Sequence, residues 1–183
     1  GAVSQLGRSG CLELLTFDMG GTSTDVSLVT GGQAVLASGM EIDGLRARTP
    51  VLDIATVGAG GGSIIWTDDG GMLRVGPTSA GANPGPASYG KGGELPTVTD
   101  ALVLLGVIAD GSLLGDTIRI SAEKARVAFQ PLATKFGVEV ETMAANAIQL
   151  AVANIVRAIQ LVSTERGFDP QDFVLVPFGG GGP

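Results

Sequence analysis

The chain contains no histidine, a single cysteine and few aromatic residues, with one Trp, one Tyr and six Phe among 183 residues. Because histidine is absent, no imidazole of this chain can act as a general base or as a metal ligand. The single Cys11 excludes an internal disulfide and a cysteine-based zinc cluster, and it fits a reducing compartment. No uninterrupted apolar run reaches the roughly 18 residues of a membrane span, and the N-terminus lacks the pattern of a signal peptide. We therefore expect a cytoplasmic location and no membrane partner.

The charge balance is acidic, with 18 Asp and Glu against 11 Lys and Arg and a net charge of −7 at pH 7. Nucleic-acid-binding surfaces are normally basic, so we expect no nucleic-acid partner. The length fits one domain over residues 1–183, which could bury roughly 70% of the surface that its unfolded chain exposes. Together with 30 glycines, these features predict a soluble, glycine-rich α/β domain.

Apolar patterns predict strands in the first part of the chain and helices in the second half. Strands are expected at 12–17, 25–29 and 34–37, a hairpin at 63–67 and 72–75, and a buried strand at 173–178. A short helix should begin at Thr99 or Asp100 and end before Gly106, and a second should follow Ser121 and end at Gly137. A third helix, from 142 to about 165, is apolar over most of its surface, which predicts that it is buried between layers.

Glycine is concentrated between residues 58 and 93, where it occupies 12 of 36 positions. A flexible linker of this density would be rich in serine and polar residues, whereas this segment also holds Ile64, Ile65, Trp66 and Tyr89. We therefore expect an ordered, turn-rich segment, with Gly58–Gly62 and Gly76–Gly93 packed near the glycine turn at residues 20 and 21. The alternative is a disordered loop.

That turn lies in the sequence Asp18-Met19-Gly20-Gly21-Thr22-Ser23-Thr24-Asp25, between two predicted strands. Paired glycines allow backbone N–H groups to approach an anion, and the hydroxyls of Thr22, Ser23 and Thr24 are further donors for phosphate oxygens. Asp18, at the end of a strand, could hold a hydrated Mg²⁺ or orient a water molecule. The segment is not a Walker A loop, because no GKS or GKT follows. The alternative is a plain Gly-Gly hairpin.

Two further glycine runs stand out. Residues 179–182 follow the last predicted strand directly, which suggests a ligand lying on the backbone, although a terminal tail would look the same. The run at 57–62 (VGAGGG) fits either a second anion-binding turn or close packing of the backbone.

Four long segments together resemble the hydantoinase A/5-oxoprolinase family. They are LLTFDMGGTSTDVSLV (14–29), TPVLDIATVGAGGGSI (49–64), VGPTSAGANPGPASYGKGG (75–93) followed by PTVTDA (96–101), and STERGFDPQDFVLVPFGGGGP (163–183). The resemblance implies an α/β fold, a fragment of an actin-like ATPase (ribonuclease H-like) fold with a mixed sheet flanked by helices. There are two departures from the family pattern: Leu102 stands where the family has Asn, and the final run is all glycine where the family reads FGGAGP.

The resemblance also implies an ATP site and assigns residues to it. Residues 18–25 resemble the second phosphate motif of the superfamily, and 179–183 resemble its adenosine motif. Asp18, Asp25 and Asp100 are then the catalytic candidates, and Asp18 is the expected ligand of Mg²⁺ or Mn²⁺. The expected ATP-binding residues are Gly20, Gly21, Thr22, Ser23, Thr24, Gly179, Gly180, Gly181 and Gly182. The first phosphate motif of the family is missing from this sequence, so we expect little ATPase activity from the chain alone.

The function implied is part of an ATP-dependent amidohydrolase, which opens a cyclic amide such as a hydantoin or 5-oxoproline by ATP-driven activation of its carbonyl. Alternatives are the ATP-binding subunit of a ketone carboxylase, a sugar or acetate-type kinase, and a chaperone-like nucleotide module on the same fold. The expected partners are a small-molecule substrate and either further copies of the protein or a second family subunit.

Overall fold

The computed structural model describes residues 10–37, 39–42, 45–47, 49–115 and 117–181. The chain divides into two compact units. Unit 1 comprises the described residues of Gly1–Met19, Thr24–Val57 and Val156–Pro183, and unit 2 comprises those of Gly20–Ser23 and Gly58–Ile155. The expectation of one domain over 1–183 stays a prediction.

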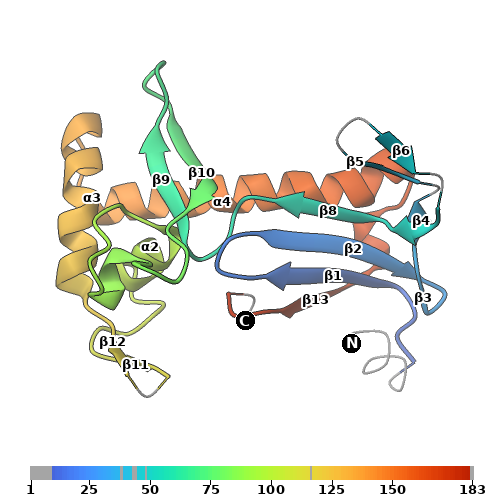
Figure 1. Cartoon of the computed structure of the whole chain (residues 1–183), viewed down its shortest axis with the longest axis horizontal. Coiled ribbons are helices and arrows are strands. Elements are labelled where there is room, and N and C mark those ends of the chain that lie inside the picture. Colours follow the sequence, from blue (N-terminus) through green and yellow to red (C-terminus); the bar gives the residue numbers. More distant parts are fainter. Residues whose placement is uncertain (1–9, 38, 43–44, 48, 116, 182–183) are drawn as a thin grey trace. The chain divides into compact units, whose positions relative to one another are not determined.

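Unit 1 is built around a mixed sheet, as expected. Its strands are β1 (Leu14–Met19), β2 (Thr24–Thr30), β3 (Gln33–Ala34), β8 (Ile54–Val57) and β13 (Val174–Phe178). The order is β13-β1-β2-β3, and β8 pairs with the other end of β2. β13 is parallel to β1, while the other pairs are antiparallel, and β13, β1, β2 and β8 lie side by side in Figure 1.

The strand expected at 34–37 is in fact divided. β3 pairs with β2, whereas β4 (Leu36–Ala37) pairs with β7 (Val51–Leu52). Between them the Val35 amide donates to the Leu28 carbonyl, and the Val35 carbonyl accepts from Asp53 N, both at 3.0 Å. The chain thus changes pairing partner at Val35, which local sequence patterns do not reveal. A further pair, β5 (Met40–Ile42) with β6 (Leu45–Ala47), completes the strands of unit 1.

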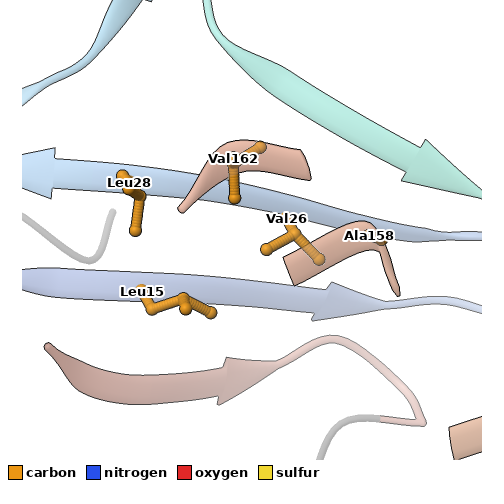
Figure 2. Close-up of a cluster of buried hydrophobic side chains, with 5 residues drawn as sticks. All are labelled: Leu15, Val26, Leu28, Ala158 and Val162. Carbon is orange, nitrogen blue, oxygen red and sulfur yellow. The ribbon is translucent and has the colours of Figure 1, made fainter. Parts of the chain in front are cut away.

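One face of this sheet carries the core of unit 1. Leu15, Val26 and Leu28 pack against Ala158 and Val162 from the last turns of helix α4 (Val140–Val162). Figure 2 shows these five side chains gathered between β1, β2 and the helix. Because side chains alternate along a strand, the residues between these positions face the other way. That second face carries Thr16, Asp18, Asp25, Ser27 and Thr56.

Unit 2 contains the predicted hairpin and the two shorter helices. β9 (Ser63–Thr67) pairs with β10 (Leu73–Ser79), and α2 (Val98–Leu104) and α3 (Ala122–Phe136) follow. The bounds predicted for α3 are confirmed, since the Ser121 hydroxyl accepts from Lys124 N and Gly137 has a φ of 65°. β11 (Leu113–Leu114) and β12 (Ile118–Arg119) form a short pair. The remaining elements are 3₁₀ turns: η2 (Ala87–Tyr89) in unit 2, and η3 (Thr164–Arg166) and η4 (Pro170–Asp172) in unit 1.

Helix α2 begins earlier than predicted. Its N-cap is Thr97, not Thr99 or Asp100, and the Thr97 side chain accepts from Asp100 N. In return the Asp100 side chain accepts from Thr97 N, which completes a capping box. The acidic residue is therefore at the third helical position, where a carboxylate also faces the positive end of the helix.

Two expectations of burial are wrong for this chain. Val152, Val156 and Leu161 of α4 are exposed, and so are Leu175 and Phe178 of β13. Apolar composition shows what an element is able to bury, but the neighbours that cover it are set by the tertiary structure.

One described helix, Val140–Arg166, is long and apolar enough to cross a membrane. The criterion is weak, because core helices of soluble proteins also meet it.

Candidate functional site

The candidate site in unit 1 lies at the carboxyl ends of two parallel strands, β1 and β13. Asp18 is the register partner of Phe178, and a glycine run follows Phe178 directly. The Gly181 amide donates to the Met19 carbonyl at 2.8 Å, so the run lies against the end of β1. Ligands of α/β sheets commonly bind at such strand ends. The structure therefore places Asp18 beside Gly179–Gly181, while Gly182 lies outside the described residues.

Glycine is required at position 179 for two reasons. Its φ is 86°, in the left-handed region that other residues rarely adopt. A Cβ at this position would lie 2.5 Å from the Met19 carbonyl oxygen and even closer to Asp18 Oδ1. At Gly180, by contrast, no atom of the described residues lies within 4 Å of the place where a Cβ would stand. One side of the glycine run thus fits Asp18 closely, and the other side is open to a ligand.

Asp25 lies next to Asp18 on the same face of the sheet. The two residues are register partners across β1 and β2, which puts their Cβ atoms about 4.5–5.5 Å apart. Neither carboxylate forms an ion pair with any described residue. Asp25 Oδ1 accepts a hydrogen bond of 2.6 Å from the hydroxyl of Thr56 on β8. Two like charges in direct opposition repel each other unless a cation lies between them.

The turn that connects β1 to β2 belongs to unit 2, and its peptide groups are oriented by a second glycine turn. The Gly20 amide donates to the Ser23 carbonyl at 2.9 Å, which closes the turn. The carbonyls of Gly20 and Gly21 accept from the amides of Gly61, at 3.0 Å, and Gly62, at 2.6 Å.

With those two carbonyls bonded to the second turn, the amides of Gly21, Thr22 and Ser23 donate to no residue in the described part of the chain. Gly21 and Thr22 are exposed, and a Cβ at Gly21 would meet no atom within 4 Å. Successive backbone amides in a turn that lack a partner within the protein are a typical binding site for a phosphate or another anion.

Gly60–Gly62 acts as a close-fitting support for this turn. A Cβ at Gly60 would lie 2.7 Å from the amide nitrogens of both Thr22 and Ser23. The support is itself fixed, because the Gly60 amide donates to Ser63 Oγ at 2.8 Å and the Gly61 carbonyl accepts from Thr99 Oγ1 at 2.9 Å. Of the two interpretations of residues 57–62, the geometry favours close packing.

The glycine-rich segment 58–93 is ordered and packs against the turn at Gly20–Ser23 within unit 2, as expected. Gly61 and Gly62 contact the turn as described, and the Ser79 hydroxyl donates to the Gly21 carbonyl at 3.4 Å. Burial also raises the pKa of Tyr89, whose hydroxyl lies beside Thr99 and within the field of Asp100. The segment 76–93 is thus part of the packed structure that holds the turn.

Two predicted site residues, Thr24 and Asp100, are fully buried within the fold. Thr24 is fully buried and faces the core side of the sheet, since it pairs with Met19 and precedes Asp25. Alternation along β2 separates its side chain from the face of Asp18 and Asp25, and its predicted contact with phosphate stays a prediction.

Asp100 is the second of these buried residues. It is fully buried, and its carboxylate accepts from the amides of Ala87 (3.2 Å), Ser88 (2.7 Å) and Thr97 (2.9 Å) and from Thr97 Oγ1 (2.8 Å). Four donors satisfy the carboxylate and leave no room for a substrate. These bonds join residues 87–88 to the start of α2 and support a structural role, while the catalytic assignment of Asp100 stays a prediction.

Asp18 and Asp25 suit a metal ion whose remaining ligands are water molecules and substrate oxygens. In the described part of the chain, no group of three or more His, Cys, Asp or Glu residues could form a protein-only metal cage. Mg²⁺ characteristically binds one or two carboxylates and completes its octahedron with water and substrate phosphates. Asp18 and Asp25 supply that donor set.

Comparison with known proteins gives several relatives. The chain is 48% identical over 168 residues to caprolactamase subunit alpha of Pseudomonas jessenii, covering 91% of this chain and 24% of that protein. It is 38% identical to the acetophenone carboxylase gamma subunit of Aromatoleum aromaticum (96% of this chain, 24% of the relative). It is also 38% identical to 5-oxoprolinase 1 of Arabidopsis thaliana (93% and 14%).

Two solved structures have the same mixed α/β arrangement. The crystal structure of ATP-dependent caprolactamase from P. jessenii matches with a TM-score of 0.88 and 46% identity, covering 99% of this chain and 26% of that one. Nucleotide-free acetone carboxylase, described as an ATP-dependent system, matches with a TM-score of 0.88 and 28% identity (98% and 26%). The chain thus spans about a quarter or less of the length of these relatives, two of which are subunits of larger enzymes. Because the family described as hydantoinase/oxoprolinase matches residues 1–183, the chain belongs to the hydantoinase/oxoprolinase family.

Proposed function

We propose that this chain supplies part of the ATP site of an ATP-dependent hydrolase that opens a cyclic amide. The observation that carries the proposal is that the amides of Gly21–Ser23, which immediately follow the strand bearing Asp18, donate to no described residue. The glycine run after β13 supports it, since its open side at Gly180 leaves room for a ligand. The proposal includes an actin-like ATPase fold for the whole protein and a cytoplasmic location.

Each group of residues has a distinct role in this proposal. Asp18 and Asp25 would hold Mg²⁺ or Mn²⁺, and the amides of Gly21–Ser23 would bind phosphate oxygens. Gly179–Gly181 would border the adenosine. When bound, ATP would supply the phosphoryl group that makes the amide carbon electrophilic toward water, so that the C–N bond of the ring can be hydrolysed. The chain's own contribution is positioning and charge compensation, which account for most of the catalysis in phosphoryl transfer.

The substrate class follows from the relatives. Caprolactamase and 5-oxoprolinase are named for cyclic amides, which is why we propose a hydantoin, 5-oxoproline or another lactam. Activation of a ketone for carboxylation is the second candidate, favoured by the likeness to acetophenone carboxylase and acetone carboxylase. Assembly with a further subunit is part of both proposals. ATP hydrolysis by the complete polypeptide, measured with each lactam and with each ketone plus bicarbonate, distinguishes the two.

The site assignment is tested by Asp18→Asn in the complete polypeptide. This change keeps size and hydrogen bonding but removes the charge, so the loss should fall mainly on kcat. We expect a fall of about 10²–10⁴-fold, the range typical for loss of one catalytic group. Gly21→Val should instead weaken ATP binding, because its side chain would occupy the open space beside Gly21, where we propose that the phosphates approach. If Asp18→Asn leaves turnover within a few-fold of the unmodified protein, the turn is only a structural hairpin.

A further inference from the structure

A polar row crosses three neighbouring strands of unit 1. Asp18 on β1, Asp25 on β2 and Thr56 on β8 are register partners, and they point to the same face of the sheet. The Thr56 hydroxyl donates to Asp25 Oδ1 at 2.6 Å. A second polar row lies two residues further along, where the hydroxyls of Thr16 and Ser27 are 2.6 Å apart.

The bond from Thr56 determines which parts of the Asp25 carboxylate are free. An ionised carboxylate only accepts hydrogen bonds, so the hydroxyl occupies one side of Oδ1 and leaves Oδ2 without a described donor. The terminal torsion of a half-buried carboxylate such as Asp25 is otherwise broadly distributed. With the hydroxyl in place, rotation breaks a short hydrogen bond. Asp25 is therefore presented in one orientation beside Asp18.

This bond contributes more to orientation than to the stability of the fold. Thr56 is exposed, and a hydrogen bond that competes with water contributes little net stability. The position of Thr56 is fixed independently by the backbone pairing of β8 with β2, which runs from Thr24 and Val57 to Ser27 and Ile54. The donor is thus held in place by a ladder that does not depend on its side chain.

We propose that Thr56 is a positioning residue for the metal of the proposed ATP site. It orients the Asp25 carboxylate toward a divalent cation shared with Asp18. This inference rests on the proposed function. Partners that hydrogen-bond a metal ligand typically change metal affinity by about 10–100-fold when they are removed.

The test uses Mn²⁺ as the probe, with the complete polypeptide in the presence of ADP, and measures free Mn²⁺ by electron paramagnetic resonance. Thr56→Val should raise the Mn²⁺ dissociation constant by about 10–100-fold, because valine keeps the shape and suits a strand but cannot donate. Thr56→Ser restores a hydroxyl and should stay within a few-fold of the unmodified protein. The matched control is Thr16→Val, which removes a hydroxyl from the same face without touching Asp25.

Two outcomes would overturn the inference about Thr56 and leave the proposed function intact. One is that Thr56→Val binds Mn²⁺ as the unmodified protein does, while Asp18→Asn loses it. The other is that Thr16→Val weakens binding as much as Thr56→Val, which would indicate a general effect on the sheet. If Asp18→Asn has no effect on Mn²⁺ binding, the metal is elsewhere, and the proposed function of this site fails together with the inference.

Discussion

The substitution Gly60→Ala tests whether the proposed phosphate-binding turn at Gly20–Ser23 depends on its glycine support. Gly60 is buried, and its backbone does not lie in the left-handed region. Alanine therefore introduces no backbone strain of its own. The perturbation is purely steric, because the new methyl group would lie 2.7 Å from Thr22 N, Thr22 C and Ser23 N.

The size of the effect follows from that contact. Ordinary Cβ contacts begin at 3.4 Å, so the turn must move by about 0.7 Å to accept the methyl group. The atoms in the way are backbone, and no side chain can rotate to relieve the contact. Inserting a methyl group into a close-packed site typically costs about 1–3 kcal/mol. If this cost falls on the bound geometry of the turn, ATP affinity drops by about 5- to 150-fold.

The assay is a titration of the complete polypeptide with ATP, combined with thermal unfolding. Gly60→Ala should weaken ATP binding and also lower the unfolding temperature. Gly70→Ala is the matched control, since its new methyl group meets only the Asp68 side chain, at 3.3 Å. Gly21→Ala should weaken ATP binding without changing the unfolding temperature, because nothing lies within 4 Å of it. Unchanged ATP affinity in Gly60→Ala would refute the argument that this glycine shapes the turn.

Three further outcomes are expected. Gly179→Ala should lower both ATP affinity and the stability of the fold. A positive φ costs about 1–2 kcal/mol in a non-glycine residue, and the methyl group would collide with Asp18. If ATP affinity and unfolding temperature both stay unchanged, the close fit at Gly179 is contradicted. Tyr89 should titrate above its ordinary pKa of 10.0, because burial raises its pKa. The contribution of this shift to the stability of the fold is therefore constant below pH 10 and is lost as the pH rises through the pKa of Tyr89 in the folded protein. An ultraviolet titration of the chain's single tyrosine checks this, and a value of 10.0 would mean that the ring is solvated. Glu141→Gln should reduce the unfolding temperature most above pH 4.5, because the hydrogen bond from Arg126 lowers the Glu141 pKa. The difference should shrink below pH 4.5 and vanish as the pH falls through the lowered value, and a difference that persists at still lower pH would exclude the ion pair as its cause.

The sequence alone determined the features that depend on local chemistry. The bounds of α3 follow from a serine that caps the first turn and a glycine that can adopt a positive φ, and both are local properties. The hairpin of β9 and β10 follows from two apolar runs and the glycine turn between them. The resemblance of long motifs likewise predicted the family, because those motifs are contiguous in the chain.

The tertiary structure alone decided which of the motif residues share a site. Asp25 and Thr24 are neighbours in sequence, yet alternation along β2 places the first beside Asp18 and buries the second. Thr56 could not be recognised as a partner of Asp25, because the register of β8 on β2 is set by pairing across 31 residues. Asp100 looked like a catalytic acid from its type, and only its four donors show that it is satisfied within the fold.

Burial is the other property that composition did not decide. The apolar residues of α4 and β13 predicted elements covered on all sides, whereas Val152, Leu161 and Leu175 are exposed in this chain. The hydrophobic effect depends on the area that neighbouring segments remove from water. A helix or strand carries its own apolar surface in its sequence, but the segments that cover that surface are brought there only by the fold.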